Sequence, residues 1–170
     1  TNVLGKILTL YPNSFYLDRS LLLVGQGLNR YGEPAKARDI FSDLEKRVPN
    51  STWLPEVELA IARTYEQEKN WPAAIRKYDA WVTSFTNHES LPRAEYWRAW
   101  NNYQAGNGTN ALALFTNFTA RFPTNELAPL AQYWVADYYD RQGDFQNAEN
   151  NYQLLYQKWP QPPSELTYRA

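Results

Sequence analysis

Few residues of this sequence could carry out chemistry. His88 is the single histidine; it lies beside Glu89 and Ser90 in a short polar stretch, and the chain has no cysteine that it could activate. Asp137 and Asp140 are three residues apart, so a helix would place both carboxylates on one face. Metal sites need several convergent ligands, and here only carboxylates could supply them. We therefore expect a surface histidine and a solvated acidic face, with no catalytic residue, no metal and no cofactor.

Two other motifs are common ones. Gly106 and Gly108 form a glycine-rich stretch, but no P-loop lysine follows them, so we expect a turn between helices. Asn-x-Ser/Thr triplets begin at Asn50, Asn107 and Asn117. Such triplets are frequent by chance and matter only in a cell that glycosylates them.

The composition excludes several classes of protein. With 17 basic and 18 acidic residues the formal net charge is −1, so the chain lacks the basic footprint of a nucleic-acid binder. No apolar run approaches the length needed to span a bilayer, so we expect no membrane insertion. Aromatic residues make up 16% of the chain, including 7 Trp and 13 Tyr. Such rings fill gaps between helices or make contact surfaces.

The strongest pattern is an internal repeat with a period of 37 residues. Residues of one type recur at this period. Two columns hold small residues, Gly25, Ala62, Ala99 and Ala136, and Ala37, Ala74, Ala111 and Ala148. A third column is aromatic, Phe41, Tyr78, Phe115 and Tyr152, and a fourth holds Pro12, Pro49, Pro123 and Pro160, with Thr86 in the remaining place. Glycines mark a turn at Gly32, Gly106 and Gly143, and Lys69 takes the remaining place. So many columns at one period predict a solenoid built from one repeated unit.

Within each unit the apolar spacing is helical. It predicts first helices over about 15–31, 53–68, 91–105 and 127–142, and second helices over about 34–48, 72–86, 109–122 and 145–158. Prolines fall in the first turns of these helices, where no N–H is needed, and Thr109 and Asp144 are candidate N-caps of the last two second helices.

The order of small residue, turn glycine, alanine, aromatic residue and proline resembles the tetratricopeptide repeat (TPR), whose usual period is 34 residues. The resemblance implies an all-α, right-handed α-solenoid of stacked antiparallel helix pairs. We expect a single solenoid over 1–170, with four full repeats at about 14–50, 51–87, 88–124 and 125–161 and partial repeats at 1–13 and 162–170.

Two stretches, 127–134 and 141–145, resemble a bacterial subtype of the TPR. That subtype is found in the periplasmic Tol-Pal accessory protein and in the outer-membrane barrel-assembly lipoprotein. The resemblance implies a scaffold of the bacterial cell envelope, periplasmic or extracellular.

The third repeat breaks the pattern. Arg98 and Asn102 stand where the other repeats have apolar residues. A buried arginine must pair or reach water, and Glu95, one turn earlier, is the expected partner. The alternative is a functional break in the stack.

The resemblance also implies an inner surface lined by first helices. On it we predict a partner-binding groove formed by Tyr96, Trp100, Tyr103 and Tyr133, flanked by Arg63 and Asp137. The alternative is that these rings pack between repeats. Against that alternative, Trp97, Trp134, Phe115 and Phe118 are expected to fill the core columns already.

Both ends of the sequence stop within a repeat. The apolar residues Leu4, Ile7 and Tyr11 at one end, and Leu166 and Tyr168 at the other, are predicted end-to-end contacts. Head-to-tail contacts of this kind give rings or open fibres.

These patterns predict a non-catalytic protein–protein interaction scaffold, not an enzyme, whose partner is a protein or peptide. One alternative is a structural subunit that forms a filament or larger array as a homo-oligomer through its solenoid ends. A second alternative is a peptide- or glycan-binding module that uses the aromatic groove.

Overall fold

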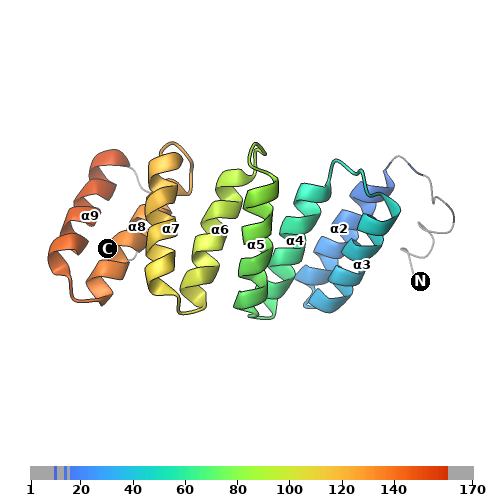
Figure 1. Ribbon diagram of the computed structural model, residues 1–170, viewed down its shortest axis with the longest axis horizontal. Helices are drawn as coiled ribbons and strands as arrows, with labels where there is room; N and C mark the ends of the chain where they lie inside the picture. The colour runs from blue at the N-terminus through green and yellow to red at the C-terminus, as the bar shows by residue number, and fades with distance from the viewer. Residues whose placement is uncertain (1–9, 11–13, 15, 161–170) are drawn as a thin grey trace. The chain divides into compact units, whose positions relative to one another are not determined.

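The computed structural model describes residues 10, 14 and 16–160. Within these residues the secondary structure consists of helices joined by turns (Figure 1). They are α2 (Leu17–Arg30), α3 (Pro34–Arg47), α4 (Leu54–Gln67), α5 (Trp71–Ser84), α6 (Leu91–Gln104), α7 (Gly108–Arg121), α8 (Ala128–Arg141) and α9 (Phe145–Lys158). Each of these helices has 14 residues, which corresponds to a length of roughly 21 Å. The predicted helices are confirmed, with ends within about three residues of those expected.

The helix starts follow local chemistry. Pro34 is the first residue of α3, and α4, α5, α6 and α8 have proline as their second residue. The Asp144 carboxylate accepts a hydrogen bond from the backbone N–H of Asn147 (3.2 Å), as expected of an N-cap. Thr109 is not the N-cap of α7, because that helix already begins at Gly108 and Asn107 precedes it.

The turn inside each helix pair requires a left-handed backbone. Gly32, Gly106 and Gly143 have φ angles of 81°, 80° and 75°, and Lys69 adopts φ 57° at the equivalent position. Glycine takes this conformation at no steric cost, whereas Lys69 must accept some strain.

The chain divides into two compact units. Unit 1 spans 1–85 and contains α2 to α5; unit 2 spans 86–170 and contains α6 to α9. In unit 1, α2 packs on α3, α4 packs on α5, and α3 packs on α4; in unit 2, α6 packs on α7, α8 on α9 and α7 on α8. The described part of each unit therefore consists of two stacked helix pairs, and the predicted all-α solenoid fold is confirmed.

The core of unit 1 forms where α4 covers the first helix pair. Phe41 and Leu44 of α3 are fully buried, together with Leu21 of α2 and Val57 of α4. At the edge of this core, Arg38 of α3 donates to the Thr64 hydroxyl of α4 (3.0 Å). The two pairs are thus joined by apolar packing and by a polar contact at its margin.

The core of unit 2 is more aromatic. Phe115 and Phe118 of α7 are buried beside Tyr96 of α6, at ring centroid distances of 5.5 and 5.8 Å from Tyr96. Val135 of α8 closes this core from the next pair. The predicted partial repeats, and with them Leu4, Ile7, Tyr11, Leu166 and Tyr168, lie outside the described residues. The single solenoid over 1–170 stays a prediction.

Candidate partner-binding site

Three rings from two first helices of unit 2 meet beside its core. Trp100 and Tyr103 are three residues apart on α6, so they share one helix face. Trp134 of α8 lies 4.9 Å from Trp100 and 4.7 Å from Tyr103 between ring centroids. These distances are in the range at which aromatic pairs attract one another, and all three rings are partly buried.

The contact between rings continues onto α9. Tyr133, next to Trp134 on α8, lies 6.3 Å from Trp134 and 6.0 Å from the ring of Tyr152 on α9. We call Trp100, Tyr103, Tyr133, Trp134 and Tyr152 the ring cluster. It spans α6, α8 and α9, so three helices fix its geometry.

A polar pair borders the ring cluster. Arg141 Nη1 donates to the Tyr103 hydroxyl (2.6 Å), and Arg141 Nε pairs with Asp137 Oδ2 (2.7 Å). The Asp137 side chain is 14% exposed but that of Arg141 is 56% exposed. Because a guanidinium carries five N–H donors, Arg141 keeps donors for a ligand while its orientation is fixed by two contacts.

The electrostatics of this edge follow from the same neighbours. Burial, together with the nearby Tyr133, Asp137 and Asp140, raises the pKa of Tyr152 to about 12 against the lowering effect of Arg141. The pKa of Arg141 is raised as well, since Asp137 and Tyr103 outweigh its partial desolvation. Tyr152 is therefore neutral and Arg141 is charged at neutral pH.

Tyr96 does not belong to this surface. It is only 6% exposed and contacts Phe115 and Phe118 in the core, whereas Trp97 beside it is partly exposed. The interpretation of Tyr96 as an exposed groove residue is therefore wrong, whereas Trp97 packs against the core as expected and keeps part of its surface exposed. Leu22 and Leu59, which occupy the same column of the repeat as Tyr96, are also buried and could have indicated this.

The other predicted groove residues fall in two places. Trp100, Tyr103, Tyr133 and Asp137 are brought together in unit 2, as described above. Arg63 lies on α4 of unit 1, where Tyr78 and Glu66 are its electrostatic neighbours. A place for Arg63 beside the rings of unit 2 stays a prediction.

Sequence reasoning did not include Arg141 or Tyr152 in the site. Arg141 is four residues after Asp137 and thus on the same helix face. Tyr152 lies 37 residues after Phe115, in an otherwise buried aromatic column. Both signals are present in the sequence, but a spacing of four residues is also that of an ordinary surface ion pair, and an aromatic column is also that of a core.

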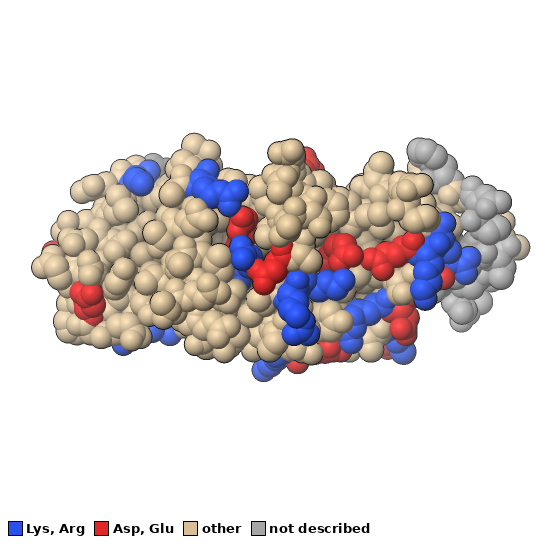
Figure 2. All heavy atoms as spheres, viewed as in Figure 1, with Lys and Arg blue, Asp and Glu red and all other residues tan. Residues whose placement is uncertain are grey.

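The surface of unit 2 carries few charges on the face that Figure 2 shows, which is mostly uncharged over α7 and α9. Exposed residues of these two helices include Thr116 and Asn117 of α7 and Gln153 and Tyr156 of α9.

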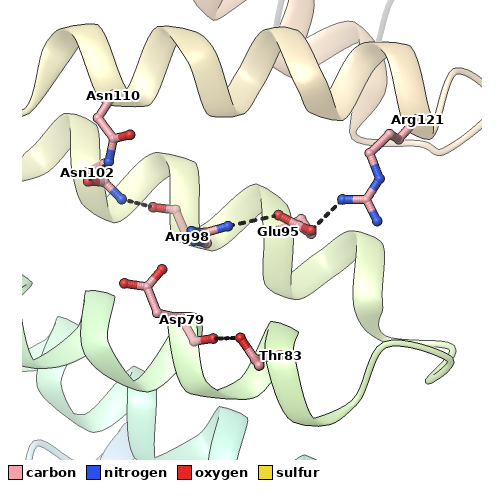
Figure 3. Close-up of polar contacts among 7 residues, drawn as sticks. All are labelled: Asp79, Thr83, Glu95, Arg98, Asn102, Asn110 and Arg121. Carbon is pink, nitrogen blue, oxygen red and sulfur yellow. Dashed lines mark hydrogen bonds and ion pairs between the residues drawn. The ribbon is translucent and has the colours of Figure 1, made fainter.

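The break in the third repeat is a satisfied polar network (Figure 3). Arg98 pairs with Glu95 (3.5 Å), as predicted, and Glu95 also pairs with Arg121 of α7 (2.6 Å). Asn102 is buried; its amide donates to the Arg98 carbonyl (2.9 Å) and its side-chain oxygen accepts from Asn110 (2.8 Å). These contacts hold α6 to α7 and favour a structural role.

The histidine, which has catalytic potential by residue type, contacts a neighbouring residue. His88 Nδ1 accepts a hydrogen bond from the backbone N–H of Ser90 (3.1 Å), which shapes the linker before α6. Among the described residues, no group of three or more His, Cys, Asp or Glu side chains is placed to hold a metal ion. No helix in the described part of the chain is long and apolar enough to cross a membrane.

Comparison with protein families gives two matches. A family model named YfiO, described as an outer membrane lipoprotein, matches residues 23–132, and a tetratricopeptide repeat model matches residues 130–162. The first match includes Trp100 and Tyr103, and the second includes Tyr133, Trp134 and Tyr152. A comparison with curated proteins finds no match.

Among solved structures, the chain is similar to a crystal structure of nearly identical TPR-like repeats from Podosopora anserina, assigned to a kinesin light chain. The TM-score is 0.71 at 14% sequence identity, and the match covers 98% of this chain and 84% of the other. At this identity the likeness concerns the fold alone.

Proposed function

The chain belongs to the outer membrane lipoprotein family YfiO, and from this premise we propose that it is a non-catalytic scaffold that binds a protein partner through the ring cluster. Family membership places it in the bacterial cell envelope. Tetratricopeptide repeats and this lipoprotein family are in general interaction scaffolds, so a protein partner is the expectation. The finer proposal is the site on unit 2.

The observation that carries the proposal is the combination of partly exposed rings with an oriented arginine. Trp100, Tyr103 and Trp134 are held by mutual ring contacts, so little conformational entropy is lost when a partner covers them. Trp, Tyr and Arg are the residue types that dominate binding energy at protein interfaces. The site has all three within contact distance of one another.

The polar groups of this site are suited to recognition. Arg141 is already oriented by Asp137 and Tyr103, and its remaining donors can receive a carboxylate or a backbone carbonyl. We propose that an extended or helical peptide segment lies over the rings and makes a polar contact with Arg141 at one end.

The experiment compares capture of envelope proteins by the full chain and by Trp100→Ala. Solubilised envelope of the bacterium that encodes the protein is passed over each immobilised variant, and the captured proteins are quantified. We expect Trp100→Ala to lose at least about 30-fold in affinity for the main partner, which is the scale of a hot-spot residue. Its free energy of unfolding should fall by less than about 2 kcal/mol, because the side chain is only partly buried.

Trp97→Ala is the matched control. It removes a partly buried tryptophan from the same helix, three residues away and outside the ring cluster. Equal loss of binding in both variants, or a loss of roughly 3–5 kcal/mol in Trp100→Ala that marks a core residue, would show that the rings serve packing. Capture of envelope glycan in place of protein would point to the glycan alternative.

A further inference from the structure

Three ionisable side chains of unit 1 meet where its two helix pairs stack. Glu45 of α3, Glu58 of α4 and Lys77 of α5 come from three helices. Lys77 Nζ pairs with Glu58 Oε2 (2.9 Å), and the side chains of Glu45 and Glu58 share a hydrogen bond. We call these three residues the carboxyl triad. Glu58 lies in its middle, because it contacts both other members.

The hydrogen bond between the two carboxyl groups requires a proton. An ionised carboxylate only accepts hydrogen bonds, so Glu45 and Glu58 can bond to each other only when one of them is protonated. The ion pair with Lys77 suits an ionised Glu58, so the proton resides on Glu45. Burial raises the pKa of Glu45, Glu58 raises it further through the hydrogen bond and its charge, and Lys77 lowers it in part.

The surroundings of Glu45 leave these two partners in control. Glu58 faces it from α4 and Lys77 from α5. On α3 itself, Phe41 and Ser42 share the face of Glu45 and are uncharged. The charged residues of α2 make other contacts or lie at its far end: Asp18 accepts a hydrogen bond from Ser51, Arg19 lies over the Trp53 ring, and Arg30 is in the last turn, next to the start of α3.

Unit 2 has the same three places without a charge. The residues two periods later are Thr119 of α7, Gln132 of α8 and Asn151 of α9. Gln132 Nε2 donates to Asn151 Oδ1 (2.9 Å), in the place of the pair between Glu58 and Lys77, and both Thr119 and Gln132 are buried. A hydroxyl and two amides therefore occupy this part of the contact between helix pairs, and none of them takes up a proton.

We propose that the carboxyl triad makes the contact between α3 and α4 sensitive to pH, so that the two helix pairs of unit 1 hold together more firmly in acid. With a proton, Glu45 donates to Glu58 across the contact. Without it, two carboxylates face each other and only Lys77 offsets their repulsion. The equivalent contact between α7 and α8 in unit 2 has no such response.

The direction of the effect follows from proton linkage. The folded state raises the pKa of Glu45 above its ordinary value of 4.5, so it holds the proton more tightly than the unfolded state does. The contribution to stability is therefore complete below the ordinary pKa and is lost as the pH rises through the folded pKa.

The first test is an NMR titration of the full chain with labelled glutamate side chains, from about pH 3 to about pH 8. We expect the Glu45 carboxyl to titrate with a midpoint above 4.5, and the amide signals around Glu58 to move with the same midpoint. Glu58→Gln should lower that midpoint because it removes a negative charge, and Lys77→Met should raise it because it removes a positive one. Amide signals around Gln132 of α8 are the internal control and should not follow the Glu45 midpoint.

The second test is the stability of Glu45→Gln, whose amide can donate to Glu58 at any pH. The equilibrium constant for unfolding of unit 1, followed in urea by the amide signals of α4, should equal that of the wild type in acid. At neutral pH it should be smaller than in the wild type by about two- to fivefold, the scale of one exposed ion pair. Asp39→Asn removes a carboxylate from the same helix outside the carboxyl triad, and should leave the pH dependence of the wild type unchanged.

Three results would overturn the proposal. A Glu45 midpoint at or below 4.5 would mean that the two carboxyl groups share no proton. Amide signals around Glu58 that do not follow Glu45, or signals around Gln132 that follow it equally, would mean that the contact between α3 and α4 has no pH response of its own. A Glu45→Gln variant that is less stable than the wild type at neutral pH would mean that ionised Glu45 holds the contact together.

Discussion

Gly25 is the position of unit 1 where the size of a side chain matters most. A Cβ atom there would lie 2.3 Å from Cε1 and 2.6 Å from Cζ of Phe41, which is fully buried. The other repeats have alanine in this column, so α2 approaches its partner helix more closely than the repeat pattern alone requires. The glycine permits that approach.

Gly25→Ala should therefore destabilise the protein. The ring of Phe41 has no room to move, and overpacking of this kind costs about 1–3 kcal/mol, more than the gain in helix propensity offsets. The free energy of unfolding in urea measures the effect.

Gly27→Ala is the control, because it lies on the same helix with nothing within 4 Å of its added Cβ. It should stabilise the protein by about 0.5–1 kcal/mol through helix propensity. If both substitutions stabilise, the close approach of α2 to Phe41 is not rigid.

Individual residues also mark the limit of sequence-based prediction. The 37-residue period identifies the columns, but it does not fix how far a helix is rotated about its axis. A small rotation decides whether Tyr96 lies in the core or on the surface, because consecutive side chains on a helix point about 100° apart. The Glu95–Arg98 pair was predictable because it is local, whereas the Asn102–Asn110 contact depends on how α6 and α7 pack.

At the scale of elements, the helices and their turns could be predicted closely. Glycine and proline act through the backbone of their own residues, so their effect is visible in sequence. The ring cluster could be predicted only in part, since Arg141 and Tyr152 reach it through the packing of α8 against α6 and α9. The residue type alone does not tell whether such a tyrosine or tryptophan lies in the core or on the surface.

The α8–α9 contact has a consequence for alkaline stability. The folded state raises the pKa of Tyr152 to about 12, above its ordinary value of 10. Below about pH 10 the tyrosine is neutral in both states, and between about pH 10 and 12 the unfolded state loses the proton first. Stability therefore falls as the pH rises through this window.

Tyr152→Phe should make that fall smaller, since it removes one of the groups responsible. Urea unfolding midpoints at about pH 9 and pH 11.5 give the difference, and Tyr31→Phe, on an exposed ring, controls for loss of a hydroxyl. Tyr78, whose pKa burial also raises, remains and keeps part of the decline. Equal declines in the wild type and in Tyr152→Phe would contradict the neutral, partly buried Tyr152 described here.

At the scale of the whole molecule, each unit has its own core. In unit 1 the core residues run from Leu17 to Ile61, and in unit 2 from Tyr96 to Val135. Repeat proteins gain stability mainly from neighbouring repeats, so two stacked pairs with a closed core form a cooperative block.

We expect residues 1–85 and residues 86–170, each produced alone, to fold. Each fragment should give a helical circular dichroism spectrum and a single cooperative urea transition, at lower denaturant than the full chain. A fragment that lacks a cooperative transition would show that its core depends on residues of the other unit.

The polar network of the third repeat limits the positions at which recombination of the gene would keep the protein stable. Glu95–Arg98, Glu95–Arg121 and Asn102–Asn110 all join residues within one repeat. A crossover in the linkers at either end of that repeat transfers these partners together, so duplication or exchange of the whole block keeps the buried amide satisfied. A crossover between α6 and α7 would separate Asn102 from Asn110 and Glu95 from Arg121. Gene duplication and exchange in this lineage should therefore have left their boundaries in the linkers, where the 37-residue period also starts anew.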